Sequence, residues 1–164
     1  MGRNANSYGY LIMKTNKNLR AFLIMVRHGE GTYTPTGYRT LFGGGTFESY
    51  ADHPRVKVTR TSRGKPITST AAGAFQFLER TWDYCQKALK LPDFSPKSQN
   101  LAATYLIQER GALDDVLAGR LFTAIRKCNK EWASLPGSPY GQPVMSLEKA
   151  RDLYIKFGGA LVEV

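Results

Sequence analysis

Apolar residues recur at helical spacing through most of this chain, and one segment, residues 31–70, interrupts that spacing. The first helical stretch, residues 16–28, places its apolar side chains at i, i+3, i+4 and i+7, as in an amphipathic helix: Leu19, Phe22, Leu23 and Val26. Asn16 is suited to cap the start of this helix, and Gly29 is suited to end it. The spacing therefore predicts a core built from packed helices, with residues 31–70 forming a different kind of structure.

The interrupting segment is rich in Gly, Thr, Tyr, Pro and Arg. Two short runs in it, residues 46–50 and 56–59, have β-type composition and are separated by turn residues. We expect a small β-hairpin or meander after the first helix, and hence an α+β fold that is mainly helical. The length suits one domain, which we place at residues 13–164, with residues 1–12 as a disordered extension outside the fold.

Helical spacing returns after the β-rich segment. Capping residues mark several starts, such as Ser95 followed by Pro96 at the first helical position, and Ser146 before the last helix. The stretch "SLPGSPYGQPV" contains three prolines and two glycines and should break the helical pattern before Ser146. The predicted helices cover residues 71–89, 95–111, 113–118, 121–132 and 146–157.

The charge balance favours an anionic partner. The chain has 23 Lys and Arg residues against 13 Asp and Glu, a formal net charge of +10. Nucleic acid, an acidic membrane surface and an anionic cell-wall polymer all fit this charge. The sequence has no helix-turn-helix signature, RNP-type motif or finger spacing, so we expect no nucleic-acid partner.

No apolar run is long enough for a membrane-spanning helix or a signal-peptide core, so we expect a cytoplasmic chain without stable membrane insertion. The two cysteines, Cys85 and Cys128, lack metal-ligand spacing and are expected in the core, as are Trp82 and Trp132. The two histidines have no partner at metal-ligand or catalytic-triad spacing. We expect both at polar surface positions, with no metal or cofactor.

Glu30 is the strongest candidate for chemistry on position alone. It lies between two glycines at the C-terminal end of the first helix, where the helix dipole disfavours a negative charge. A carboxyl with a raised pKa can act as a general acid at neutral pH, and the aromatic residues that follow could shield it from water. An exposed acid past a helix end is the alternative that the pattern leaves open.

Other residues could complete a site. Glu48 or Asp52 facing Glu30 across a cleft would match the two-carboxylate layout of glycosidases. Gln76, one turn into a predicted helix, could hold hydroxyl or acetamido groups. Tyr140 and Gln142 lie on the Pro- and Gly-rich loop, which could form the rim of a groove. Each of these has an ordinary structural explanation, and spacing does not decide between them.

Six stretches occur in this order along the chain: "AFLIMVRHGEGTY", "GGGTFESYADHPR", "STAAGAFQFLERTWD", "DFSPKSQ", "ERGAL" and "WASLPGSPYGQ". In this order they resemble the lambda-type endolysin family of bacteriophages and prophages, and the resemblance runs from about Leu19 to the C-terminus. It implies a lysozyme-like α+β fold with a cleft between a small β part and a helical part. The chain departs from the family pattern at His28-Gly29, and the stretch between Glu30 and Gly43 is shorter.

The resemblance also implies an activity. The family cleaves the β-1,4 bond between N-acetylmuramic acid and N-acetylglucosamine of peptidoglycan as a lytic transglycosylase, which leaves 1,6-anhydro ends. Its catalytic glutamate matches Glu30. Hydrolysis by Glu30 with Asp52 or Glu48 is the alternative within the same fold, and a non-catalytic wall-binding or nucleic-acid-binding protein is the alternative outside it.

The family's cleft has two lips, which correspond here to residues 56–66 and 136–145. Candidate wall residues that bind the substrate are Tyr50, Asp52, His53, Gln76, Tyr140 and Gln142. The resemblance further implies peptidoglycan glycan strands as the partner, a monomer that depends on a holin for access to the wall, and a location in the host cytoplasm until lysis and then in the periplasm. The basic residues would attract the carboxylates of peptidoglycan.

Overall fold

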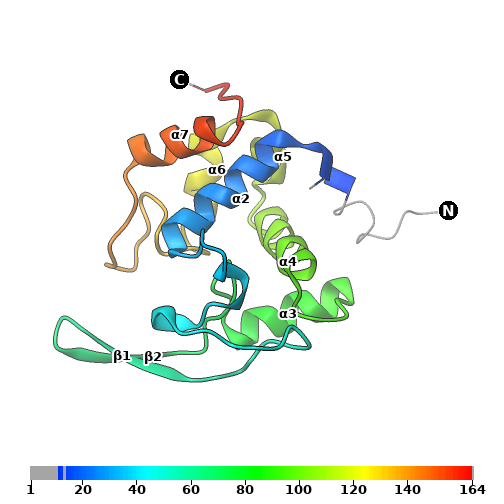
Figure 1. Ribbon diagram of the computed structural model, residues 1–164. Coiled ribbons are helices and arrows are strands. Elements are labelled where there is room, and N and C mark those ends of the chain that lie inside the picture. The colour runs from blue at the N-terminus through cyan, green and yellow to red at the C-terminus, as the bar shows by residue number, and fades with distance from the viewer. Residues whose placement is uncertain (1–10, 13, 164) are drawn as a thin grey trace.

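The computed structural model describes residues 11, 12 and 14–163. Helices α2, α5, α6 and α7 form the upper part in Figure 1, α4 runs through the middle, and α3 lies below with a two-stranded hairpin that reaches outward. This is the mixed α+β architecture that the sequence predicted. The elements are α2 (Lys17–Glu30), two short 3₁₀ turns (Gly37–Arg39 and Phe42–Gly44), β1 (Val58–Ser62), β2 (Lys65–Ser69), α3 (Glu79–Leu89), α4 (Pro96–Glu109), α5 (Leu113–Ala118), α6 (Leu121–Cys128) and α7 (Leu147–Lys156).

Helix α2 starts as predicted and ends later than predicted. The Asn16 side chain accepts a hydrogen bond from the Leu19 amide at 3.0 Å. The helix continues through Gly29 to Glu30, and Gly31, with φ 72°, takes the left-handed conformation that closes it. The prediction that Gly29 ends α2 was wrong. A glycine closes a helix in this way when it adopts a positive φ, and here Gly31 does so and Gly29 does not.

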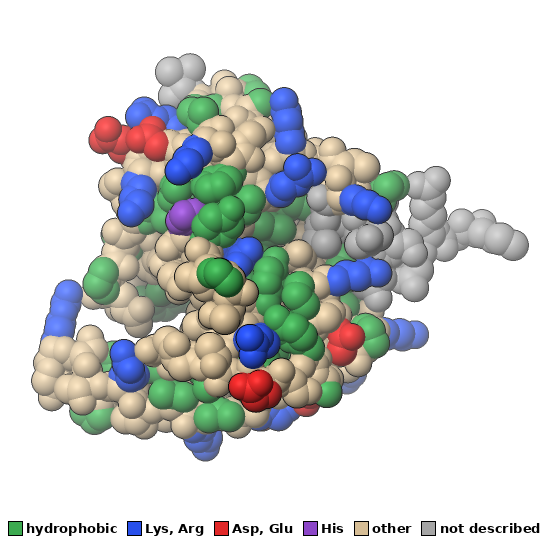
Figure 2. Space-filling view, in the orientation of Figure 1, with side chains coloured by type: hydrophobic (Ala, Val, Ile, Leu, Met, Phe, Trp, Pro, Cys, Tyr) green, Lys and Arg blue, Asp and Glu red, His purple; other side chains and the backbone are tan. Residues whose placement is uncertain are grey.

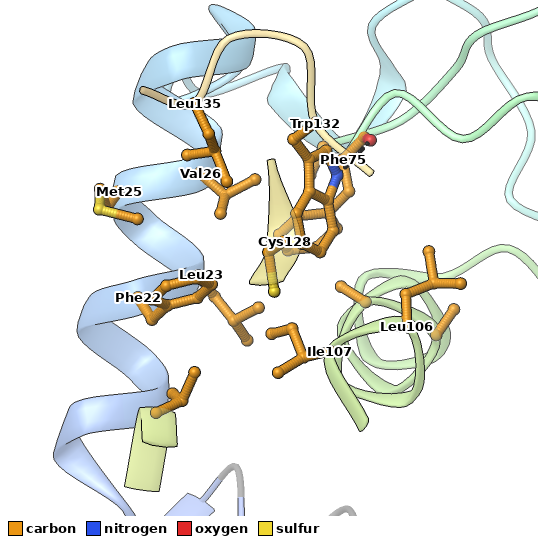
Figure 3. Packing of buried hydrophobic residues seen from close by; sticks show 14 of the residues in the cluster. Phe22, Leu23, Met25, Val26, Phe75, Leu106, Ile107, Cys128, Trp132 and Leu135 are labelled. Atoms are coloured by element: carbon orange, nitrogen blue, oxygen red, sulfur yellow. Dashed lines mark hydrogen bonds between the residues drawn. The ribbon is translucent and has the colours of Figure 1, made fainter. Parts of the chain in front are cut away.

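The core lies between α2 and the later helices. Figure 3 shows Leu23 and Val26 of α2 on the side that faces Cys128 and Trp132, with Phe22, Phe75, Leu106, Ile107 and Leu135 in the same cluster. Cys85 and Cys128 are both free and buried, and Trp82 and Trp132 are no more than 2% exposed. These four core predictions are confirmed.

The β part is one antiparallel hairpin. β1 pairs with β2 in a register that sets Thr59 opposite Thr68 and Arg60 opposite Ile67. Arg63 and Gly64 both have positive φ, as a tight two-residue hairpin turn requires. The predicted run at 56–59 overlaps β1, whereas the predicted run at 46–50 forms only an isolated bridge between Thr40 and Thr46. The pattern was weak because nearly every hairpin side chain is exposed, so no apolar alternation marks the strands.

Helix α3 begins eight residues later than the predicted start at 71, at Glu79. Residues 71–78 form a tight loop in which Ala72 and Phe77 exchange two backbone hydrogen bonds, at 3.1 and 2.9 Å. Gln76 has φ 49° inside this loop, so the prediction that it lies in a helix was wrong. Helices α4, α5 and α7 are as predicted, and α6 is shorter, ending at Cys128.

Residues 1–10, which make up most of the predicted N-terminal extension, lie outside the described residues. Ile12, also assigned to that extension, is helical and packs against the core. Within the described part of the chain, no helix is both long and apolar enough to span a membrane. The described residues also contain no group of three or more His, Cys, Asp or Glu side chains that could hold a metal ion.

Candidate active site

Glu30 is the last residue of α2, and its carboxyl is largely removed from water. Burial raises the pKa of Glu30 from its ordinary 4.5 to about 7, because a carboxylate loses more hydration than a neutral carboxyl. The exposed-acid alternative is therefore excluded by the structure. At neutral pH a large fraction of Glu30 carries the proton that a general acid needs.

Ser134 opposes the effect of burial on the pKa of Glu30. Its hydroxyl acts on the Glu30 carboxyl and lowers the pKa, although less than burial raises it. The Ser134 Oγ atom is buried and makes no hydrogen bond of standard geometry with the described residues. A Cβ atom on Gly29 would lie 2.5 Å from this Oγ, so Gly29 provides the space in which Ser134 approaches the helix end.

The loop that carries Ser134 is held from both sides. The Ser134 carbonyl accepts a hydrogen bond from the Met145 amide at 2.7 Å, and the Trp132 indole N–H donates to the Phe75 carbonyl at 3.1 Å. On the other side of Glu30, the Thr32 hydroxyl donates to the Ala74 carbonyl inside the protein. Segment 74–77 is therefore held to the residues that follow α2, and segment 132–134 carries the hydroxyl that acts on Glu30.

These two segments also line a cavity of about 630 Å³. The cavity brings together two of the predicted wall residues, Gln76 and Tyr140, with Phe75 and Trp132 beside them. In Figure 2 the surface is notched at the left of the view, between the end of the hairpin and the helical part above it. Glu30 is not among the residues that line this cavity.

Gln76 and Tyr140 are fixed by the protein. The Gln76 side-chain amide donates to the carbonyls of Thr40 and Gly73, at 3.1 and 2.8 Å. The Tyr140 hydroxyl donates to the Lys130 carbonyl at 2.9 Å, while the ring remains exposed. An exposed aromatic ring in this cavity suits stacking against a sugar. Gln142 is exposed on the same loop and does not line the cavity.

The other three predicted wall residues have internal partners. His53 is 2% exposed, and its Nε2 atom lies 2.8 Å from the Phe77 carbonyl. The expectation of a surface position for His53 was wrong because this ring supports the 71–78 loop from inside. Tyr50 is half-buried against Phe47, and the Tyr50 carbonyl accepts from the Phe94 amide at 2.7 Å. Their assignment to the cleft wall stays a prediction.

Asp52 is bound by Arg55, with 3.0 Å between the carboxylate and Nε. Arg55 also pairs with Glu79 and Asp83 of α3, so it ties the base of the hairpin to that helix. Burial is the largest single effect and raises the pKa of Asp52, but the hydrogen bonds from Arg55 and from the His53 amide, together with the positive charge of Arg55, outweigh it, so the pKa is lowered. Glu48 has a side chain that is 94% exposed and lies 3.9 Å from Arg39. Neither Asp52 nor Glu48 is buried to the extent that Glu30 is, and the charge partner of each is an arginine, not a group at the Glu30 site.

His28 is partly buried at the side of the same helix end. Its ring lies 4.4 Å from that of Tyr33 and 5.4 Å from that of Phe157. Burial, helped by Lys149 and Lys156, lowers the pKa of His28 and favours the neutral ring.

The sequence alone did not predict a role for Ser134. The one signal that could have indicated it is that Ser134 lies in "WASLPG", one of the stretches that resemble the family.

Known proteins resemble this chain in both sequence and fold. A family model for endolysins matches residues 20–161. The endolysin of Escherichia phage lambda is 42% identical over 162 residues, which cover 93% of this chain and 99% of that protein. The chain belongs to the endolysin family.

Other relatives of this endolysin agree. The endolysin of Escherichia phage P2 is 42% identical, with 90% of this chain and 97% of that protein covered. The structure of bacteriophage lambda lysozyme complexed with a chitohexasaccharide has a TM-score of 0.84 at 40% identity, covering 90% of this chain and 97% of the other. A second structure, lysozyme from bacteriophage lambda, has a TM-score of 0.77 at 42% identity with the same coverage. The lysozyme-like fold is therefore confirmed.

Proposed function

We propose that this endolysin is a lytic transglycosylase that cleaves the β-1,4 bond between N-acetylmuramic acid and N-acetylglucosamine in peptidoglycan. The observation that carries the proposal is the Glu30 carboxyl at the end of α2, whose pKa burial raises to about 7, while Glu48 is exposed and Asp52 is paired with Arg55. One carboxyl is sufficient for a transglycosylase because the nucleophile belongs to the substrate.

The reaction uses Glu30 twice. The protonated carboxyl donates its proton to the glycosidic oxygen as the bond from C1 of N-acetylmuramic acid breaks. The resulting carboxylate then accepts the proton of the C6 hydroxyl, and O6 bonds to C1. The products are a 1,6-anhydro sugar and a free 4-hydroxyl, and no water is consumed. Ring closure is intramolecular, so correct orientation of the sugar supplies much of the rate.

A hydrolysing muramidase would need a second carboxylate as nucleophile or as base for a water. Asp52 is occupied by Arg55, and Glu48 is surrounded by solvent. Asp52→Asn and Glu48→Gln should therefore leave the identity of the products unchanged. Oligosaccharide binding is supported by the related lambda lysozyme, whose structure contains a chitohexasaccharide, and by the exposed Tyr140 ring in the cavity.

The test is mass spectrometry of muropeptides released from purified peptidoglycan. The proposal predicts products lighter than hydrolytic ones by the mass of one water, and Glu30→Gln, which is nearly isosteric, should release almost none. Glu48→Gln is the matched control, since it makes the same chemical change at an exposed site. Products with reducing ends would establish the muramidase alternative, and wild-type activity in Glu30→Gln would refute the role of Glu30.

A further inference from the structure

A groove beside α2, separate from the cavity that Gln76 and Tyr140 line, is lined by positive charge. Its volume is about 430 Å³, and it lies between α2, the loop that follows it and Asn100 of α4. Three of its lining residues are cationic, Lys14, Arg20 and Arg27, and the described lining includes no acid. Figure 2 shows this face of the molecule, with Lys, Arg and hydrophobic side chains over the region of α2.

Arg27 is held in this groove without a carboxylate. Its guanidinium carbon lies 4.4 Å from the centre of the Tyr38 ring and 5.2 Å from that of Tyr33. Its Nη2 atom donates to the Thr32 carbonyl at 2.9 Å. Its Nε atom is buried and meets no acceptor among the described residues. By contrast, Arg55 has carboxylate partners within 3.0 Å.

The position of Arg27 is fixed before any ligand binds. The Tyr38 hydroxyl donates to the Asn100 side-chain oxygen at 2.9 Å, which anchors one ring of the pair. Gly37 leaves room for the guanidinium, because a Cβ atom there would lie 2.8 Å from Arg27 Nη2. Arginine held between aromatic rings is suited to carboxylate or phosphate.

The arrangement favours an extended ligand over a single ion. Arg20 and Arg27 are seven residues apart on one face of α2, about 10 Å along the helix axis. The cationic side chains line a groove, which a polymer chain can enter and a flat membrane surface cannot. Nucleic-acid sites stack bases on free aromatic faces. Here Arg27 covers both tyrosines, and Tyr33 also packs against His28 and Phe157.

We infer that this groove binds a second stretch of glycan strand through the lactyl and peptide carboxylates of peptidoglycan, outside the site of Glu30. The inference rests on the proposed function, because it takes the same polymer as ligand. A second contact of this kind keeps the enzyme on the wall between cleavage events.

The test measures sedimentation with purified peptidoglycan sacculi in a Glu30→Gln background, so that the strands stay intact. Adding Arg27→Gln should weaken binding about tenfold, the size expected for losing a charged hydrogen bond. Arg20→Gln should also weaken binding, and it preserves the fold, since its one long bond reaches the Lys14 carbonyl at 3.4 Å. Arg126→Gln, the same charge change at an exposed position on α6, is the matched control and should bind as the background protein does.

Two further ligands test whether a binding defect comes from lost recognition of carboxylates or from weaker binding at the Glu30 site. Amidation of the sacculus carboxylates should abolish the difference between the Arg27 variant and its background. Affinity for chitohexasaccharide, which has no carboxylate, should be the same in both. The inference is overturned if the Arg27 and Arg20 variants bind sacculi as tightly as the Arg126 variant does. It is also overturned if the defect appears with anionic phospholipid vesicles or single-stranded oligonucleotides instead of sacculi. The two proposals can fail separately. If the wild-type protein releases anhydro products and the Arg27 variant binds sacculi normally, the proposed function stands and only this inference is refuted.

Discussion

Burial of Glu30 should make the stability of this endolysin depend on pH in a way that one substitution removes. The pKa of Glu30 is about 7 in the folded chain and 4.5 when the group is in water. Between these values the folded state binds a proton that the unfolded state has released. The stability contributed by Glu30 is therefore complete below pH 4.5 and is lost as the pH rises through 7.

The size of the effect follows from the two pKa values. Each pKa unit corresponds to about 1.4 kcal/mol, so ionising Glu30 between pH 5 and pH 8 costs roughly 2.5 kcal/mol of the free energy of unfolding. Glu30→Gln cannot ionise and does not pay this cost. Relative to wild type, the variant should gain roughly 2.5 kcal/mol between pH 5 and pH 8.

Urea denaturation followed by tryptophan fluorescence measures this, because Trp82 and Trp132 are both buried. Wild type and Glu30→Gln are compared at pH 5 and pH 8, and contributions from other titrating groups cancel in the difference between the two proteins. Glu48→Gln, at an exposed carboxyl, should show no such change. A difference between wild type and Glu30→Gln that is the same at both pH values would refute the burial argument.

Three further predictions concern the same helix end. The initial rate of peptidoglycan solubilisation should be level below pH 7 and fall about tenfold per pH unit above it, as the acid form of Glu30 is lost; a fall that begins near pH 4.5 would contradict the raised pKa. Ser134→Ala removes the hydroxyl that favours the carboxylate, so the falling limb of this pH–rate profile should move to higher pH, and an unmoved limb would mean that Ser134 does not act on Glu30. Gly29→Ala puts a Cβ atom 2.5 Å from Ser134 Oγ and should lower the free energy of unfolding by about 1–3 kcal/mol in urea denaturation. The double variant Gly29→Ala/Ser134→Ala should recover part of that loss, and no recovery would show that the clash lies elsewhere.

Local signals in the sequence were sufficient for several elements. The spacing of Leu19, Phe22, Leu23 and Val26 predicted α2, and Ser95-Pro96 and Ser146 predicted the starts of α4 and α7, because caps and helical periodicity act within a few residues. The start of α3 and the form of residues 46–50 were predicted wrongly. Backbone pairing of Ala72 with Phe77 overrode the helical spacing of residues 71–78, and no periodic pattern in the sequence indicates such pairing.

For the site, the sequence by itself determined the candidate acid and its place at a helix end, and the shared motifs indicated the family. Only the tertiary structure decided that Glu30 is buried, that Ser134 approaches it across Gly29, and that Asp52 is bound by Arg55. It alone placed Arg27 between two tyrosines with no carboxylate. The reason is physical: a pKa and a charge partner depend on groups distant in the chain, and hydration is lost only when the chain packs around them.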